Sequence, residues 1–138
     1  MIAAVGRSGQ IGLGEKLPWT KDAEDLAFFE LATRKNIVVL GSRTFDTLFE
    51  CQPVWNDRMV LRMSRHNTQI YEGKLLGYFE PGVQRIIQEF ADKPLDLFVA
   101  GGSCTFKVWR QHIRRSFITH VDYNGKADRW MSNLWVRT

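Results

Sequence analysis

The chain has 138 residues, of which 44% are apolar and 25% are charged, a composition typical of one soluble globular domain spanning residues 1–138. Its two cysteines, Cys51 and Cys104, lie far apart and outside any CxxC or Cys/His ligand spacing. This argues against a metal site and against a secreted disulfide framework. The apolar start of the chain is too short for a signal peptide or a membrane span, so we expect a cytoplasmic protein with no membrane partner.

The net charge of +4 favours anionic partners in general. Nucleic acid is one candidate, because aromatic residues are interleaved with arginines along the chain. However, aromatic residues in a small domain mostly form its core, and no RNA- or DNA-binding motif is present. We therefore expect no nucleic-acid partner, and a nucleotide cofactor would use the same positive charges.

Strand-like and helix-like segments alternate along the chain. Apolar, β-rich runs predict strands at residues 2–5, 37–40, 58–64, 76–79, 95–100 and 117–121. Helical spacing and capping residues predict helices at residues 22–35, from 41 onward, 81–91 and 103–109. Gly9, Gly12 and Gly14 predict that residues 9–19 form an irregular, mobile loop. The alternation predicts an α/β fold of three layers, with a mostly parallel central sheet and helices on both of its faces.

Two of the predicted strands end in glycine followed by a hydroxyl residue that starts a helix. These junctions are Leu40-Gly41-Ser42 and Ala100-Gly101-Gly102-Ser103. Free backbone N–H groups and the positive end of a helix dipole favour anions at such a junction, although ordinary capping by serine explains one junction equally well. If the two strands are neighbours, a pyrophosphate would lie between the helix starts. The glycines from Gly9 to Gly14 have P-loop spacing but lack the lysine, and no strand-flanked GxGxxG motif exists.

Asp25 is a candidate proton donor. It lies one turn inside the predicted helix beside Leu26, Phe28 and Phe29, and an apolar setting raises the pKa of a carboxyl group. The alternative is structural, because the helix dipole favours acidic residues in a first turn.

Several motifs, in a fixed order between about Ile2 and Asp122, resemble those of small dihydrofolate reductases. They are IAAV, IG, LPW with an acid six residues after the tryptophan, LGSRTF, DRMVLRMSR, VAGGSCTF and ITHVD. The resemblance implies NADPH-dependent reduction of 7,8-dihydrofolate to tetrahydrofolate, with hydride transfer to C6 and protonation at N5. The expected partner is then this small-molecule substrate of folate and one-carbon metabolism.

The resemblance also implies a role for individual residues. The expected catalytic residues are Asp25, Thr119, which supports it, and Trp19, which closes the loop. The expected substrate contacts are Ile2, Ala4, Leu17, Phe29, Arg58 and Ala100, with Arg58 pairing with a carboxylate of the glutamate tail. The expected cofactor contacts are Ala4, Ile11, Gly12, Gly41, Ser42, Arg43, Thr44, Ser64, Arg65, Gly101, Gly102, Ser103, Cys104, Thr105 and Phe106. A cis peptide bond is expected between Gly101 and Gly102.

The chain departs from the family pattern in three places. Only 16 residues follow Asp122, where the family continues into a closing β-hairpin. An unpaired sheet edge there would invite self-association, so the protein is expected to be a monomer or a homo-oligomer through its C-terminal edge. A short substitute strand or a dimer contact is the expectation for Trp130, Met131, Leu134, Trp135 and Val136. Phe106 replaces the usual tyrosine, and Ala100 is smaller than the usual isoleucine or valine, which should widen the pocket.

Two alternative functions remain open from the sequence. One is a reductase of the same fold that acts on another pterin or on a pyrimidine. The other is a degenerate homologue with a structural or binding role, which the shortened end and the unusual Arg62 in a strand would suit.

Overall fold

The computed structural model describes residues 1–14, 17–19, 23–48, 58–64, 70–71, 74–78 and 82–131. The strands are β1 (Ile2–Val5), β2 (Gln10–Gly12), β3 (Ile37–Gly41), β4 (Met59–Ser64), β5 (Ile70–Tyr71), β6 (Lys74–Tyr78), β7 (Leu97–Val99), β8 (Phe117–His120) and β9 (Arg129–Trp130). The helices are α1 (Ala23–Thr33), α2 (Ser42–Leu48), α3 (Gly82–Phe90) and α4 (Ser103–Trp109), with a 3-10 turn, η3 (Arg110–His112), after the last.

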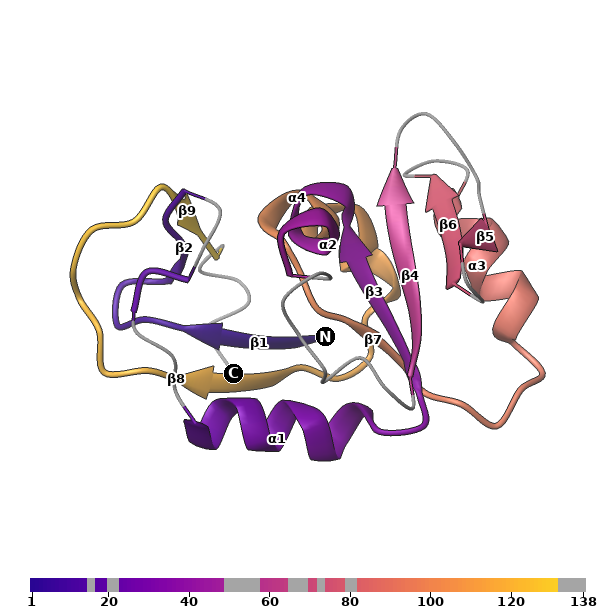
Figure 1. Cartoon of the computed structure of the whole chain (residues 1–138), viewed down its shortest axis with the longest axis horizontal. Coiled ribbons are helices and arrows are strands. Elements are labelled where there is room, and N and C mark those ends of the chain that lie inside the picture. Colours follow the sequence, from indigo (N-terminus) through magenta and orange to yellow (C-terminus); the bar gives the residue numbers. More distant parts are fainter. Residues whose placement is uncertain are drawn as a thin grey trace.

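The strands form a mostly parallel arrangement (Figure 1). The largest sheet has the order β5-β6-β4-β3-β7, in which β3 runs parallel to both β4 and β7, and β4 runs parallel to β6. A second parallel pair joins β1 to β8, and an antiparallel pair joins β2 to β9. The α/β class is therefore confirmed. The predicted single sheet is divided, because β1 and β8 run across the direction of β3 and β4, and a backbone ladder requires aligned strands (Figure 1).

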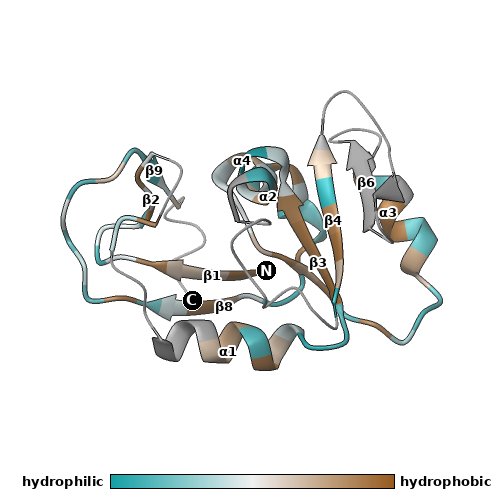
Figure 2. Ribbon diagram, in the orientation of Figure 1, coloured by the Kyte–Doolittle hydropathy of each residue, from teal (hydrophilic) through white to brown (hydrophobic). Residues whose placement is uncertain are grey.

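The core has two parts, one on each face of the main sheet. The side chains of β3 alternate between them: Ile37 and Val39 belong to the larger cluster, whereas Val38 and Leu40 belong to the smaller one. The larger cluster includes residues of α3 and α4, and the smaller one includes Phe45 of α2, with Phe29 of α1 packed against it. Figure 2 shows β3 as one of the most hydrophobic segments of the chain. Helices thus cover both faces, as the unbroken apolar run of β3 predicted.

The main differences from the predicted elements are at their ends. The helix predicted over residues 22–35 ends at Thr33, because Lys35 adopts a left-handed φ of 60° that turns the chain into β3. The predicted loop after residue 9 contains β2, and the strand predicted at 76–79 is β6 of a hairpin with β5. Trp130 lies in β9, which pairs with β2 and not with β8, and residues 132–138 lie outside the described residues.

None of the helices in the described ranges has the length and apolar run needed to cross a membrane. Within the same ranges, no three acidic, histidine or cysteine side chains gather as a metal site would require.

Candidate functional site

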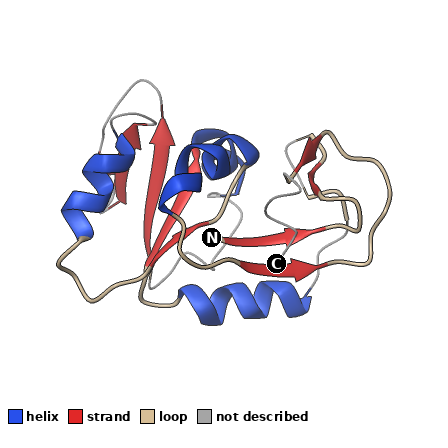
Figure 3. Ribbon diagram, turned by 180° about the vertical axis from the view of Figure 1, so that it is seen from behind, coloured by secondary structure: helices blue, strands red, loops and turns tan. Residues whose placement is uncertain are grey.

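The two glycine junctions predicted from the sequence lie side by side. Because β3 and β7 are neighbours, the Gly41 N–H donates to the Gly101 carbonyl oxygen at 2.7 Å. The Ala100 N–H donates to the Val39 carbonyl oxygen at 2.9 Å, which continues the ladder up to the junctions. The peptide bond between Gly101 and Gly102 is cis, as expected. The starts of α2 and α4 therefore meet at one end of the sheet, as shown from behind in Figure 3.

The junctions approach so closely that their contact leaves little room for a side chain. A Cβ on Gly41 would lie 2.5 Å from Thr105 Oγ1, and a Cβ on Gly102 would lie 3.3 Å from Thr44 Oγ1. Thr105 is buried, so its side chain has no open space into which to move. Backbone N–H groups beside small hydroxyl side chains form a surface suited to a pyrophosphate, and these residues therefore fit the cofactor implied by the sequence.

The other expected cofactor residues around the junctions differ in exposure. Arg43 and Cys104 are exposed, whereas Ser42 and Ser103 are half-buried. Phe106 is only 4% exposed and belongs to the larger core cluster, with its ring beneath Gly101. The expected residues farther away are Ile11 and Gly12 in β2, Ser64, whose side chain lies outside the described residues, and Arg65, which lies outside them entirely.

Four of the residues expected to contact or support the substrate lie in two pairs. Phe29 of α1 and Ala100 after β7 both pack against the smaller core cluster. Ala4 of β1 lies opposite Thr119 of β8 in the parallel ladder, one position after the pairing of Ala3 with Ile118. The backbone of Asp25 is in the first turn of α1, and its side chain lies outside the described residues.

The expected tail-binding residue, Arg58, is held by the end of α1. Its Nε donates to Thr33 Oγ1 at 2.7 Å, and its guanidinium also donates to the Glu30 carbonyl oxygen. Thr33 is fully buried and donates in turn to the Phe29 carbonyl oxygen at 2.7 Å. A guanidinium oriented in this way needs little further ordering to bind a carboxylate.

The expected loop residues are Leu17 and Trp19. Leu17 is 49% exposed, and Trp19 is half-buried with its ring 5.8 Å from that of Tyr123. Trp19 Nε1 is a buried donor without a hydrogen-bond partner in the described part of the chain.

The segment after β8 holds the chain just before these loop residues. The Gly14 N–H donates to Asp128 Oδ2 at 2.9 Å, and the Met131 N–H donates to the Gly9 carbonyl oxygen at 2.7 Å. The pairing of β2 with β9 lies between these two contacts.

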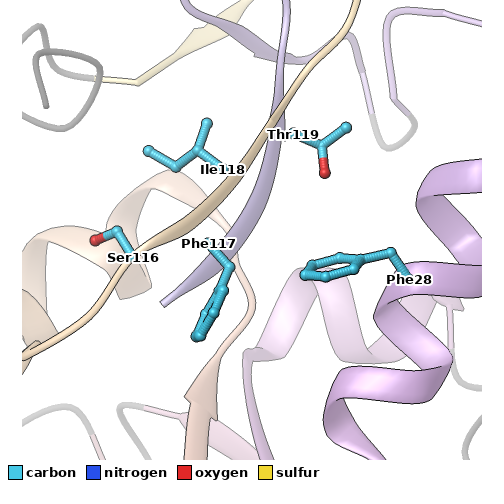
Figure 4. Close-up of a pocket in the computed structure, with 5 residues that line it drawn as sticks. All are labelled: Phe28, Ser116, Phe117, Ile118 and Thr119. Atoms are coloured by element: carbon cyan, nitrogen blue, oxygen red, sulfur yellow. The ribbon is translucent and has the colours of Figure 1, made fainter.

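A pocket of about 400 Å³ lies between α1 and β8 (Figure 4). Its lining residues are Phe28, Ser116, Phe117, Ile118 and Thr119. Phe28 was expected to surround Asp25 with apolar surface, but it is 41% exposed. Its ring instead lies 6.3 Å from that of Phe117. The expected apolar setting is therefore open to solvent on the Phe28 side.

Four residues with structural roles at the site were missed in the sequence: Glu30, Thr33, Tyr123 and Asp128. Each acts through a contact between segments that are distant in the chain, and none carries a local motif. In the sequence, Arg62 is only an unusual charge in a strand. It donates to both carboxylate oxygens of Asp46 on α2, each at 2.9 Å, and this hydrogen bonding raises the pKa of its guanidinium.

The chain is similar to several known proteins. The family model described as dihydrofolate reductase matches residues 1–137. Dihydromethanopterin reductase of Methylorubrum extorquens is 28% identical over 140 residues, covering 98% of this chain and 90% of that relative. Dihydrofolate reductase type 9 of Escherichia coli is 25% identical over 130 residues, covering 93% of this chain and 72% of that relative.

A solved structure is similar as well. Dihydrofolate reductase from Enterococcus faecalis, complexed with NADP(H) and RAB-propyl, matches with a TM-score of 0.79 and 29% sequence identity. The match covers 96% of this chain and 75% of that one. The family match over nearly the whole chain and the paired glycine junctions agree with each other. The chain belongs to the dihydrofolate reductase family and is an NADPH-dependent oxidoreductase.

Proposed function

We propose that the chain reduces 7,8-dihydrofolate to tetrahydrofolate with NADPH, and that Asp25 promotes protonation of N5. The observation that carries this proposal is the position of Arg58 at the end of α1, held by Thr33 and Glu30. Asp25 belongs to the first turn of the same helix. One helix thus carries a candidate acid near one end and orients a candidate carboxylate-binding arginine near the other. This suits a substrate with a pterin ring and a carboxylated tail.

The reaction adds a hydride to C6 of the substrate and a proton to N5, so that the C6–N5 double bond becomes a single bond. Bound NADPH supplies the hydride from C4 of its nicotinamide and leaves as NADP⁺. Two sets of residues hold the two molecules. The paired junctions would hold the pyrophosphate through Gly41, Ser42, Thr44, Gly102 and Ser103, with Arg43 at their rim.

The pterin ring would lie between Phe29 and Ala100 on one side and the Ala4–Thr119 pair on the other. In this arrangement the Thr119 hydroxyl supports Asp25, and Asp25 hydrogen-bonds the ring and favours its N5-protonated form. Closure of the loop that carries Leu17 and Trp19 excludes water, which strengthens the interaction between the carboxyl group and the ring.

A second candidate substrate is dihydromethanopterin, another dihydropterin. This candidate is supported by the dihydromethanopterin reductase of Methylorubrum extorquens. The chain matches 90% of the length of that relative, but only 72% of the length of the Escherichia coli type 9 relative. The transfer of hydride and proton to the ring would be the same. The two substrates differ in the group attached to the pterin, so Arg58 is the residue that should distinguish them.

The test is NADPH oxidation, followed by absorbance, with each dihydropterin in turn. We expect turnover with dihydrofolate that falls by at least about a hundredfold in Asp25→Asn, the usual range for loss of a general acid. Arg58→Lys should raise KM for dihydrofolate and leave kcat nearly unchanged, because lysine cannot make the bidentate contact.

Arg110→Lys is the matched control, since Arg110 is exposed in η3 and belongs neither to the junctions nor to α1. Turnover confined to dihydromethanopterin would replace the proposed substrate with the second candidate. Full activity in Asp25→Asn would remove the proposed role of that carboxyl group.

A further inference from the structure

The strand β8 has one edge that pairs with β1 and one edge that does not pair within the described chain. On the paired side, the Phe117 N–H donates to the Met1 carbonyl oxygen, and the Val121 N–H donates to the Val5 carbonyl oxygen. The Met1 amine donates to the Arg115 carbonyl oxygen. Backbone groups alternate in direction along a strand, so those of Ser116, Ile118 and His120 point away from β1. No described residue bonds to them, and β8 contains no lysine, proline or bulge of the kind that protects an open edge.

The surface beside this edge is aromatic. Phe28 and Phe117 are 41% and 39% exposed, and the Phe117 ring also lies 6.2 Å from that of Phe98. The pocket of about 400 Å³ opens between Phe28, Phe117 and Thr119 on the α1 side of β8 (Figure 4). Leu31, one turn after Phe28 on α1, is 76% exposed. A helix with apolar side chains on more than one face is usually covered on more than one face.

We propose that a second copy of this chain pairs with β8 through β8 of its own, in an antiparallel ladder whose two-fold axis passes between the two copies of Ile118. In this register Ile118 faces Ile118 of the second copy, and Ser116 faces His120 of the second copy. These are the residues whose backbone groups point outward, and each such pair exchanges two hydrogen bonds. A two-fold interface needs a self-complementary surface, and an open strand edge is one.

The charges at the two ends of the strand favour this orientation. Arg114 precedes β8 and Asp122 follows it. Both are exposed, and Asp122 Oδ1 already lies 2.6 Å from Arg7 Nε of its own chain. In the antiparallel register centred on Ile118, Arg114 lies opposite Asp122 of the second copy. A parallel pairing would place like charges together and would be repelled.

The same register closes the pocket. Side chains directly opposite each other point to the same face of a sheet, so Phe117 of the second copy lies beside Thr119 on the α1 side. That side chain would fill the pocket that Phe28, Phe117 and Thr119 leave open. The second copy thus contributes an aromatic wall next to Thr119, a residue of the proposed substrate site. The inference rests on the open edge and does not depend on which substrate is reduced.

Sedimentation velocity over a range of protein concentrations tests the pairing. We expect a concentration-dependent dimer in the wild-type chain. His120→Pro removes an outward-pointing N–H group and should raise the dimer dissociation constant at least about tenfold. His120→Ala keeps that N–H group and should leave the dimer intact. Phe28→Glu places a charge at the pocket and should also prevent pairing, whereas Leu95→Glu, at a leucine that is 36% exposed before β7, should not.

Amide exchange provides the second measurement. The Ile118 and His120 amides should become protected as the concentration rises, in step with dimer formation. A wild-type chain that is monomeric at all concentrations, or a dimer that neither His120→Pro nor Phe28→Glu weakens, overturns the proposal. Protection of these amides that is independent of concentration also overturns it, because the edge would then be filled by the chain's own residues.

Discussion

Thr33 Oγ1 lies 2.7 Å from Arg58 Nε and 2.7 Å from the Phe29 carbonyl oxygen, so one buried hydroxyl joins the last turn of α1 to the residue before β4. It accepts a hydrogen bond from the arginine and donates one to the helix. We expect Thr33→Val, which has nearly the same shape, to free Arg58 from its orientation. KM for dihydrofolate should rise about three- to tenfold with kcat nearly unchanged, which corresponds to the net value of about one hydrogen bond.

Steady-state kinetics checks this prediction, and Thr33→Ser is its control because it retains the hydroxyl. If Thr33→Val lowers kcat and leaves KM unchanged, the hydroxyl acts on the chemical step and not through Arg58.

The contact between Gly41 and Thr105 gives a second prediction. Gly41→Ala should destabilise the fold by about 1–3 kcal/mol and weaken NADPH binding, because its Cβ would lie 2.5 Å from the buried Thr105 hydroxyl oxygen. Adding Thr105→Ala removes that oxygen and should restore part of both losses. Urea unfolding and NADPH titration of the two single variants and the double variant measure this coupling. Strictly additive effects would show that the Thr105 hydroxyl oxygen is not the cause of the two losses.

The central part of the fold could be predicted because its signals are local. Four consecutive apolar, β-rich residues at 37–40 predict a strand covered on both faces, and all four are buried. The glycine and hydroxyl residues at the ends of β3 and β7 predict two neighbouring junctions, and Gly41 bonds directly to Gly101. Strand pattern and turn chemistry there depend only on adjacent residues.

The parts that could not be predicted depend on long-range pairing. The strand β2 is three residues long and is formed by pairing with β9, more than a hundred residues later. Arg62 reads as a break in a strand, yet its charge is neutralised by Asp46 of α2, with the Phe45 ring 6.0 Å away. No spacing rule connects such partners, so Asp128 and Thr33 were found only in the structure.

The hydrogen bond from the Gly14 N–H to Asp128 Oδ2 predicts a kinetic effect at a distance from the junctions. Asp128→Ala should lower kcat about two- to tenfold, because the chain just before Leu17 and Trp19 loses its contact with the segment after β8. The Gly14 amide should exchange faster in the same variant. Asp128→Asn keeps an acceptor oxygen and should retain most of the activity. If the Gly14 amide exchanges faster while kcat is unchanged, the motion of this segment does not limit the rate of turnover.

The amine of Met1 predicts a pH dependence of stability for a chain that begins at this residue. Burial lowers its pKa from 8.0 to about 6, while it donates to the Arg115 carbonyl oxygen at 2.8 Å. Between these two pH values the unfolded chain binds a proton that the folded chain does not, so the free energy of unfolding should fall as the pH decreases from 8 to 6 and level off below 6. With allowance for partial exposure to solvent, the loss should be about 1–2 kcal/mol. Urea unfolding across this range should show the loss in the free chain and not in a chain acetylated at Met1, a comparison that cancels the histidines common to both. If the free energy of unfolding changes with pH equally in the two chains, another group is responsible for the change. The amine of Met1 would then not contribute to the stability of the β1–β8 pair.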